Sequence, residues 1–218
     1  MKTILFMWVM LAVSSCEPVY AADCQKALFG WDTKSGYHIN GTFGNEGGYQ
    51  NLPGDSGNFR NGKNCGGTNY GITCRDHPGV DVKHLTKAEA AKIYHDNEWV
   101  MIDGDHIISQ YLAYKVQDLV INMGTAGVFV YEKTINDLNG KDKDFPLKGR
   151  VTPEMTAWIN RYTAPALMAD GTISDEARWH FFDHLKLNAM KRYLSLAKKN
   201  PKLKQFLLTW AERDIEDE

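Results

Sequence analysis

The 218-residue sequence predicts a mainly helical α+β fold. From residue 86 onwards, apolar residues recur at helical spacing, and the runs are separated by glycine or proline. The stretch 46–73 is different, because it is rich in glycine and asparagine and ends in an alternating run. Such a run is typical of a short β-strand. We therefore expect six or so helices around one small β-hairpin element.

Composition is that of a globular protein with one or two compact domains, since 43% of the residues are hydrophobic. The formal net charge is −2, which does not favour a nucleic-acid or membrane-surface partner. Charge is uneven, however: residues 186–204 contain seven lysine or arginine residues and no acidic residue. This cluster is either a solvated helix face or a patch that attracts an anionic polymer.

The first 21 residues are expected to be an export signal. Lys2 is followed by ten apolar residues, Ile4–Val13, which suit a signal sequence and are too few for a membrane-spanning helix. Cleavage after Ala21 gives a soluble periplasmic or extracellular protein. The run ending at Cys16 also resembles a lipoprotein box, in which case the signal is 1–15 and Cys16 is a lipid anchor of an outer-membrane lipoprotein. An uncleaved anchor is a third possibility, and all three place the folded chain outside the cytosol.

Three cysteines follow this segment, so at most one internal disulfide forms among them. Cys65 and Cys74 lie nine residues apart and flank the alternating run, a spacing that suits a bridge across a hairpin. Cys24 is the alternative partner for either one. Disulfides persist in exported proteins, which agrees with the predicted signal.

Helix boundaries are marked by capping residues. Thr86 and Glu89 form a capping box that begins a helix expected to end at Trp99. Thr152 followed by proline begins another helix. The remaining expected helices are 107–123, which presents one long apolar face, 126–138, 174–199 and a last one at about 202–213. Ahead of the β element, Phe29, Trp31 and Tyr37 are expected packing residues.

Three residues of the β stretch have the chemistry of a glycosidase. Glu46 precedes two glycines, where a polymer can approach the backbone closely. Asp55 and Thr68 follow within the same turn-rich stretch. An acid can protonate the leaving oxygen of an acetal, while a second acid and a hydroxyl hold a water or stabilise the cation.

At these residues the chain resembles glycoside hydrolase family 108, a family of bacterial and phage N-acetylmuramidases with a lysozyme-like fold. The resemblance rests on EGGY from Glu46, on Asp55 and on GGTNYGIT from Gly66, and it continues through DLVINMG, residues 118–124, to WAER, residues 210–213. It implies a hydrolase domain at about 43–214, with a C-terminal helical part from about 150, preceded by an extension at 22–42. In this chain, residues 58–65 are an insertion relative to the family pattern.

The resemblance implies roles for particular residues. Glu46 is the expected general acid. Asp55 either holds or activates the water or belongs to a plain turn, and Thr68 either holds the water or is only a strand residue. Tyr49 and Tyr70 are candidates for substrate binding and for an apolar wall beside Glu46. Asn122 either caps its helix or binds a sugar acetamido group. No cofactor or metal is implied; His180 and His184 lie four apart on a helix, but no third ligand accompanies them.

The expected function is hydrolysis of the β-1,4 bond between N-acetylmuramic acid and N-acetylglucosamine in peptidoglycan strands, by an exported monomer. A lytic transglycosylase uses the same substrate and a single glutamate, and it is one alternative. A non-catalytic wall-binding protein is the other. The sequence does not specify whether the activity serves phage release, wall remodelling, toxin export or attack on rival bacteria.

Overall fold

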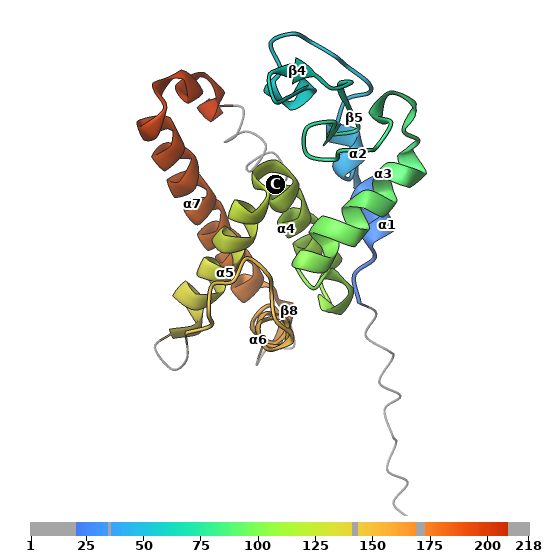
Figure 1. Ribbon diagram of the computed structural model, residues 1–218. Coiled ribbons are helices and arrows are strands. Elements are labelled where there is room, and N and C mark those ends of the chain that lie inside the picture. Colours follow the sequence, from blue (N-terminus) through green and yellow to red (C-terminus); the bar gives the residue numbers. More distant parts are fainter. Residues whose placement is uncertain (1–20, 35, 141–143, 169–172, 209–218) are drawn as a thin grey trace, which may run out of the picture.

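The structure, a computed structural model, describes residues 21–34, 36–140, 144–168 and 173–208. Its helices form two groups on either side of the central helix α4, Gln110–Met123 (Figure 1). The first group carries all the β pairs near the Glu46 stretch, and the second is almost entirely helical. The expected export signal and the WAER block fall outside the described residues.

The first group comprises short elements. Its helices are α1 (Cys24–Phe29), α2 (Thr42–Asn45) and α3 (Lys87–Tyr94), and a π-helical segment, His95–Trp99, continues α3. The strands are β1 (Trp31–Asp32), β2 (His38–Ile39), β3 (Phe59–Arg60), β4 (Lys63–Asn64), β5 (Thr68–Asn69) and β6 (Ile72–Thr73). Single 3₁₀ turns lie at Ser56–Asn58, Val82–His84 and Gly104–His106.

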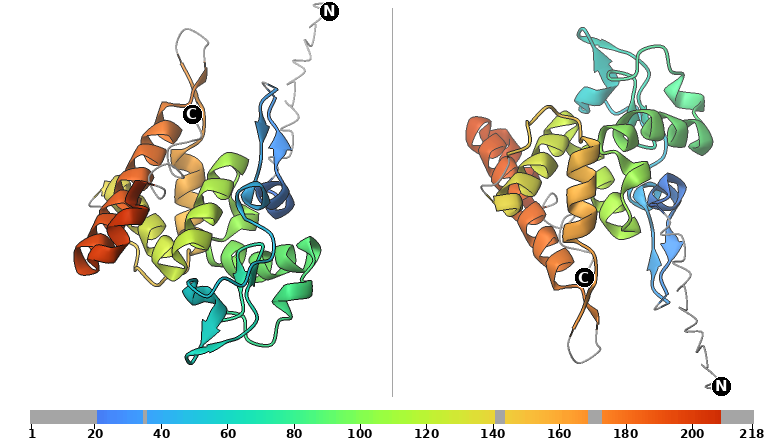
Figure 2. Two further views of the ribbon diagram at one scale, coloured as in Figure 1. Left: turned by 90° about the horizontal axis from the view of Figure 1, so that it is seen from above. Right: turned by 90° about the horizontal axis from the view of Figure 1, so that it is seen from below.

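The second group is built from long helices. These are α5 (Thr125–Asn139), α6 (Pro153–Tyr162) and α7 (Glu176–Lys199), followed by a 3₁₀ segment at Pro201–Phe206. One further strand pair, β7 (Ala166–Leu167) and β8 (Ile173–Ser174), projects from this group (Figure 2). The mainly helical α+β class predicted from the sequence is confirmed.

Helix α4 is the buried axis of the molecule. It packs against α1 on one side and α5 on the other, and Leu112, Val116 and Leu119 of the predicted apolar face are buried. Its predicted start at 107 is wrong by three residues, because the Ser109 side chain caps the amide of Leu112 and sets the first turn there. Gly124 ends the helix with a positive φ of 60°, as expected for a residue at this position.

The other predicted caps are present. Thr86 and Glu89 form a reciprocal capping box at the start of α3. Thr152 accepts a hydrogen bond from the amide of Met155, and Pro153 is the first residue of α6. Both starts are fixed by local side-chain chemistry, which explains why the sequence located them.

Among the described residues, the strands form four separate antiparallel pairs, each of two-residue strands. The run Thr68–Thr73 was expected to be one strand, but it folds into a hairpin in which Thr68 pairs with Thr73 and Asn69 with Ile72. The turn between them is Tyr70–Gly71, and φ is positive at both residues, 50° and 78°. Positive φ at both central residues is the pattern of a type I′ hairpin turn.

A contiguous apolar core runs through both groups. Its largest fully buried side chains include Trp99, Tyr131 and Phe181. Among the expected packing residues, Trp31 packs against the core, Phe29 is half exposed although its ring contacts Phe43, and Tyr37 is 73% exposed. The expectation for Tyr37 is therefore wrong; it lies just before β2 in the β1–β2 pair, away from the core.

The predicted disulfide is present, joining Cys65 to Cys74 with their Cα atoms 5.7 Å apart. Cys24 is a buried free thiol, and burial raises its pKa to about 12. The alternative pairing with Cys24 is therefore excluded in this structure. In the described part of the chain, no helix combines the length and apolar character needed to cross a membrane.

Candidate active site

Glu46 lies where α2 ends and an extended segment begins. Its amide donates to the carbonyl of Thr42, which closes the last turn of α2. The segment then runs beside β5: the Tyr70 amide donates to Gly47 O at 3.1 Å, and Gln50 and Thr68 exchange two backbone hydrogen bonds of 2.8 Å. Glu46 is thus attached to the hairpin by main-chain hydrogen bonds on its C-terminal side.

Asp55 and Thr68 belong to one network of side-chain hydrogen bonds. Gln50 Nε2 donates to Asp55 Oδ2, and Asn58 Nδ2 donates to Gln50 Oε1 at 2.9 Å. The Thr68 hydroxyl donates to Asn58 Oδ1 at 2.8 Å. Asn58 is completely buried. Two residues thirteen positions apart are therefore connected through two intervening amide side chains.

Backbone groups fix the direction of every bond in this network. The Leu52 amide donates to Gln50 Oε1 at 2.8 Å, so Gln50 must present its NH₂ to Asp55. The Leu52 carbonyl accepts from Asn58 Nδ2 at 3.0 Å, so Asn58 must present its oxygen to Thr68. The proton of the Thr68 hydroxyl is therefore committed to Asn58. Toward any further group, Thr68 Oγ1 is an acceptor.

The carboxylate of Asp55 is held from both of its oxygens. Oδ1 accepts from the Gly57 amide at 2.8 Å, and Oδ2 accepts from Gln50. Each carboxylate oxygen has a second lone pair, so Asp55 keeps acceptor capacity for a water or a sugar hydroxyl. Asp55 and Thr68 consequently offer two acceptors supported by one rigid network.

The insertion at residues 58–65 does not separate these residues. It forms the β3–β4 hairpin, in which Phe59 pairs with Asn64, and its last residue, Cys65, is joined to Cys74 by the disulfide. Its first residue, Asn58, is a central member of the network. The insertion therefore contributes Asn58 to the support of Thr68 and, through Gln50, of Asp55.

One arginine lies near this network. The hydrogen bond from Arg75 to Asp76 lowers the pKa of that carboxyl and raises the pKa of the guanidinium. Asp55 makes a smaller contribution to raising the pKa of Arg75. Arg75 Nη1 also reaches Ser56 Oγ at 3.4 Å, directly beside Asp55 in the chain. The site thus has a cation on the Asp55 side.

The three candidate substrate contacts differ in position. Tyr49 is 41% exposed beside the Glu46 segment, and its ring lies close to Gly67. Tyr70 is half buried, and its ring packs edge-on against Phe43 at 5.8 Å. Asn122 is exposed near the end of α4, and Gly124 rather than Asn122 is the C-terminal cap of that helix. Substrate contact by all three stays a prediction.

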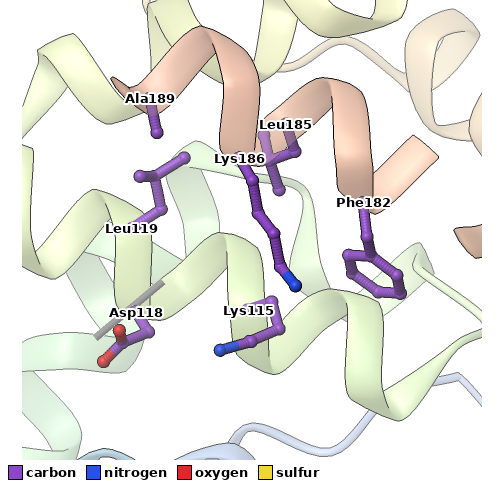
Figure 3. A pocket seen from close by; sticks show the side chains of 7 residues that line it. All are labelled: Lys115, Asp118, Leu119, Phe182, Leu185, Lys186 and Ala189. Carbon is purple, nitrogen blue, oxygen red and sulfur yellow. The ribbon is translucent and has the colours of Figure 1, made fainter. Parts of the chain in front are cut away.

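Two surface hollows lie on the helical group, away from the residues of the network. One is between α4 and α7, where it is lined by Lys115 and Asp118 from α4 and by Phe182 and Lys186 from α7 (Figure 3). The other includes Asn122 and is lined further by Met123, Ala126, Arg192, Tyr193 and Leu196. The Asn122 hollow is where an acetamido contact would have to form if Asn122 binds sugar.

Metal-binding side chains do not gather in the described part of the chain: it holds no group of three or more His, Cys, Asp or Glu residues placed to bind an ion. His180 and His184 lie with their rings 4.4 Å apart. His180 Nδ1 is hydrogen-bonded to the Tyr162 hydroxyl at 2.8 Å. The pair therefore packs against α6.

Sequence reasoning missed Gln50, Asn58 and Tyr94. Gln50 and Asn58 are ordinary polar residues in a loop, and only their position between Glu46, Asp55 and Thr68 could have drawn attention to them. Tyr94 lies on α3, and its hydroxyl donates to the Tyr70 carbonyl at 2.8 Å from 24 residues away. A contact across that separation has no local signal in the sequence.

Comparison with solved structures finds SagA of Brucella abortus among the matches. The two chains are 22% identical, the alignment covers 80% of this chain and 90% of that one, and the TM-score is 0.48. Comparison with curated proteins finds no match.

The family model described as Glycosyl hydrolase 108 matches residues 39–124. The matched range contains Glu46, Asp55, Thr68 and the whole of α4 as far as Gly124. The WAER block expected to end the domain lies beyond it. The match confirms the resemblance to glycoside hydrolase family 108 over this range.

Proposed function

We propose that the chain is an exported N-acetylmuramidase. It hydrolyses the β-1,4 bond between N-acetylmuramic acid and N-acetylglucosamine in peptidoglycan. The observation that carries this proposal is the network joining Asp55 to Thr68 beside Glu46, within the range of the family match. Glu46 is the general acid that protonates the leaving oxygen. Asp55 and Thr68 hold the water that attacks the anomeric carbon.

The direction of the hydrogen bonds supports this division of roles. Because the Thr68 proton is committed to Asn58, a water between Asp55 and Thr68 donates one hydrogen to each. The lone pairs of that water remain available for attack, and Asp55 accepts the proton that the water loses. A threonine that donated to the water would instead occupy one of those lone pairs.

Hydrolysis with a water between two carboxyl groups leads to inversion at the anomeric carbon, and it requires the groups to be roughly 6.5 to 9.5 Å apart. The product then has a free reducing end of inverted configuration. A lytic transglycosylase instead forms a 1,6-anhydro end, which is lighter by one water and is not reduced by borohydride. Mass spectrometry of a borohydride-treated digest separates the two reactions. Predominantly anhydro products would replace the muramidase by a transglycosylase.

The role of Glu46 is tested by Glu46→Gln, which keeps the side-chain shape and removes the transferable proton. We expect the rate of peptidoglycan hydrolysis to fall about 100- to 10,000-fold. The matched control is Glu89→Gln, which makes the same change at an exposed glutamate in the first turn of α3, outside the site. Equal rates for wild type and Glu46→Gln at equal folded concentration would remove Glu46 from the mechanism.

A further inference from the structure

Tyr94, a tyrosine outside the family motif, contacts the hairpin turn that lies next to Glu46. Tyr94 is the last residue of α3, is 2% exposed, and belongs to no motif identified in the sequence. Its hydroxyl donates to the Tyr70 carbonyl, at the first position of the hairpin turn. Its ring also packs on Phe43 of α2, with ring centroids 5.9 Å apart. Tyr94 therefore contacts both elements that precede and follow Glu46.

Gly71 shows how close these groups lie. A methyl group on its Cα would lie 2.3 Å from the Tyr94 hydroxyl oxygen and 2.9 Å from Glu46 Oε2. It would also lie 3.1 Å from the carboxyl carbon of Glu46. The Tyr94 hydroxyl oxygen and Glu46 Oε2 therefore lie no farther apart than the sum of 2.3 Å and 2.9 Å. The turn backbone and the Tyr94 hydroxyl together form a wall against one oxygen of the Glu46 carboxyl.

The turn that forms this wall contains an unfavourable backbone conformation. Tyr70 has a φ of 50°, which is unfavourable for a residue with a bulky side chain. Such conformations persist only where the surroundings fix them, and they gather at functional sites. Here the hydrogen bond from Tyr94 fixes the Tyr70 carbonyl, while the Tyr70 ring packs on Phe43 and lies 5.9 Å from Lys87 Nζ.

We propose that Tyr94 is a positioning residue for Glu46, acting through the Tyr70–Gly71 turn. The proposal rests on the proposed function, in which Glu46 is the acid. With Oε2 placed against the wall, the rotation of the carboxyl group is restricted. Reaction rates depend steeply on such placement, because a shift of about 1 Å can cost about 100-fold.

The first variant is Tyr94→Phe, assayed on soluble, uncrosslinked peptidoglycan strands. Loss of the hydroxyl removes one side of the wall and leaves the strained turn without its hydrogen bond. We expect kcat to fall about 10- to 100-fold with KM within twofold of wild type. Tyr162→Phe is the matched control, since its hydroxyl also makes one 2.8 Å hydrogen bond, to His180, in the helical group. That control is expected to keep wild-type kcat.

The second variant tests whether the two groups act together. Gly71→Ala introduces a methyl group against Tyr94 and Glu46 and also strains the positive φ, so it is expected to lower kcat strongly. If both changes disturb the same carboxyl, their effects are not additive. The double variant Gly71→Ala/Tyr94→Phe is then expected to have a kcat no lower than that of Gly71→Ala alone.

The outcomes separate the two proposals. A wild-type protein without glycosidase activity would overturn the proposed function, and the role of Tyr94 with it. An active wild type would overturn only the role of Tyr94 if Tyr94→Phe kept the kcat of the Tyr162→Phe control, if it changed KM alone, or if the two effects on kcat were additive. Unfolding midpoints measured for all variants identify any loss of kcat that reflects unfolding during the assay.

Discussion

The site-bearing half and the helical half of the molecule are held together by different interactions. Around Asp55, side-chain amides and backbone groups make most of the contacts, strands are two residues long, and a disulfide closes the loop. In the helical half, long helices pack through fully buried side chains such as Tyr131 and Phe181. The difference implies that the geometry around Asp55 depends on individual hydrogen bonds, whereas the helical half depends on the burial of apolar side chains.

Glu98 lies at the junction of the halves. It belongs to the π-helical segment that follows α3, and this segment packs against α4. Its Oε2 atom is buried and has no hydrogen-bond partner among the described residues. Burial raises the pKa of the Glu98 carboxyl to about 7. The junction thus contains a group whose ionisation opposes folding.

The largest expected effect on stability is in the helical half. Phe181→Ala removes a fully buried ring that packs edge-on against Tyr131. We expect the free energy of unfolding to fall by about 3 to 5 kcal/mol, measured by urea denaturation. Activity per folded molecule should stay near wild type. Leu194→Ala, at a 44% exposed position of the same helix, is the control, and an equal loss in both variants would contradict the role of the buried Phe181 ring in stabilising the helical half.

The next effect is at the junction and depends on pH. The folded pKa of Glu98 is about 7, against 4.5 for the ordinary carboxyl, so the native state holds the proton more tightly. The stability that this group contributes is complete below pH 4.5 and is lost as pH rises through 7. The full loss is at most about 3 kcal/mol, since one pKa unit corresponds to about 1.4 kcal/mol.

Glu98→Gln should therefore flatten the dependence of unfolding free energy on pH between 5 and 8. Asp96→Asn is the control on the same segment: the hydrogen bond from Lys92 lowers the pKa of Asp96, so its titration lies below this range. Urea denaturation at several pH values measures both. An unchanged slope in Glu98→Gln would show that Glu98 is not the titrating group.

The smallest effect is confined to the site. The disulfide between Cys65 and Cys74 closes a short loop, and in the chain-entropy model it raises the free energy of unfolding by about 2 to 3 kcal/mol. Reduction removes this stabilisation. We expect amide hydrogen exchange to accelerate in the β5–β6 hairpin while α4 keeps its protection, and activity to fall. A Cys65→Ala/Cys74→Ala variant checks that the reductant acts through this bond. Equal acceleration in α4 would mean that the two halves unfold as one unit.

Local chemistry in the sequence determined several features. The capping box at Thr86 and Glu89, the start of α6 at Pro153 and the end of α4 at Gly124 were all predicted, because each depends on residues within one turn. The family motif located the stretch around Glu46, and the spacing of Cys65 and Cys74 indicated the disulfide. These features involve neighbours along the chain or a short loop.

Tertiary structure decided how the site is supported. The exposure of Asn122 and Tyr37, the hairpin in place of a single strand, and the contact from Tyr94 to the turn were not predictable from periodicity. Asn58 gave no signal of its own, yet it is fully buried and fixes the direction in which Thr68 donates its proton. The physical reason is that a polar side chain acquires its role from the partners that meet it, and those partners come together only when distant segments pack.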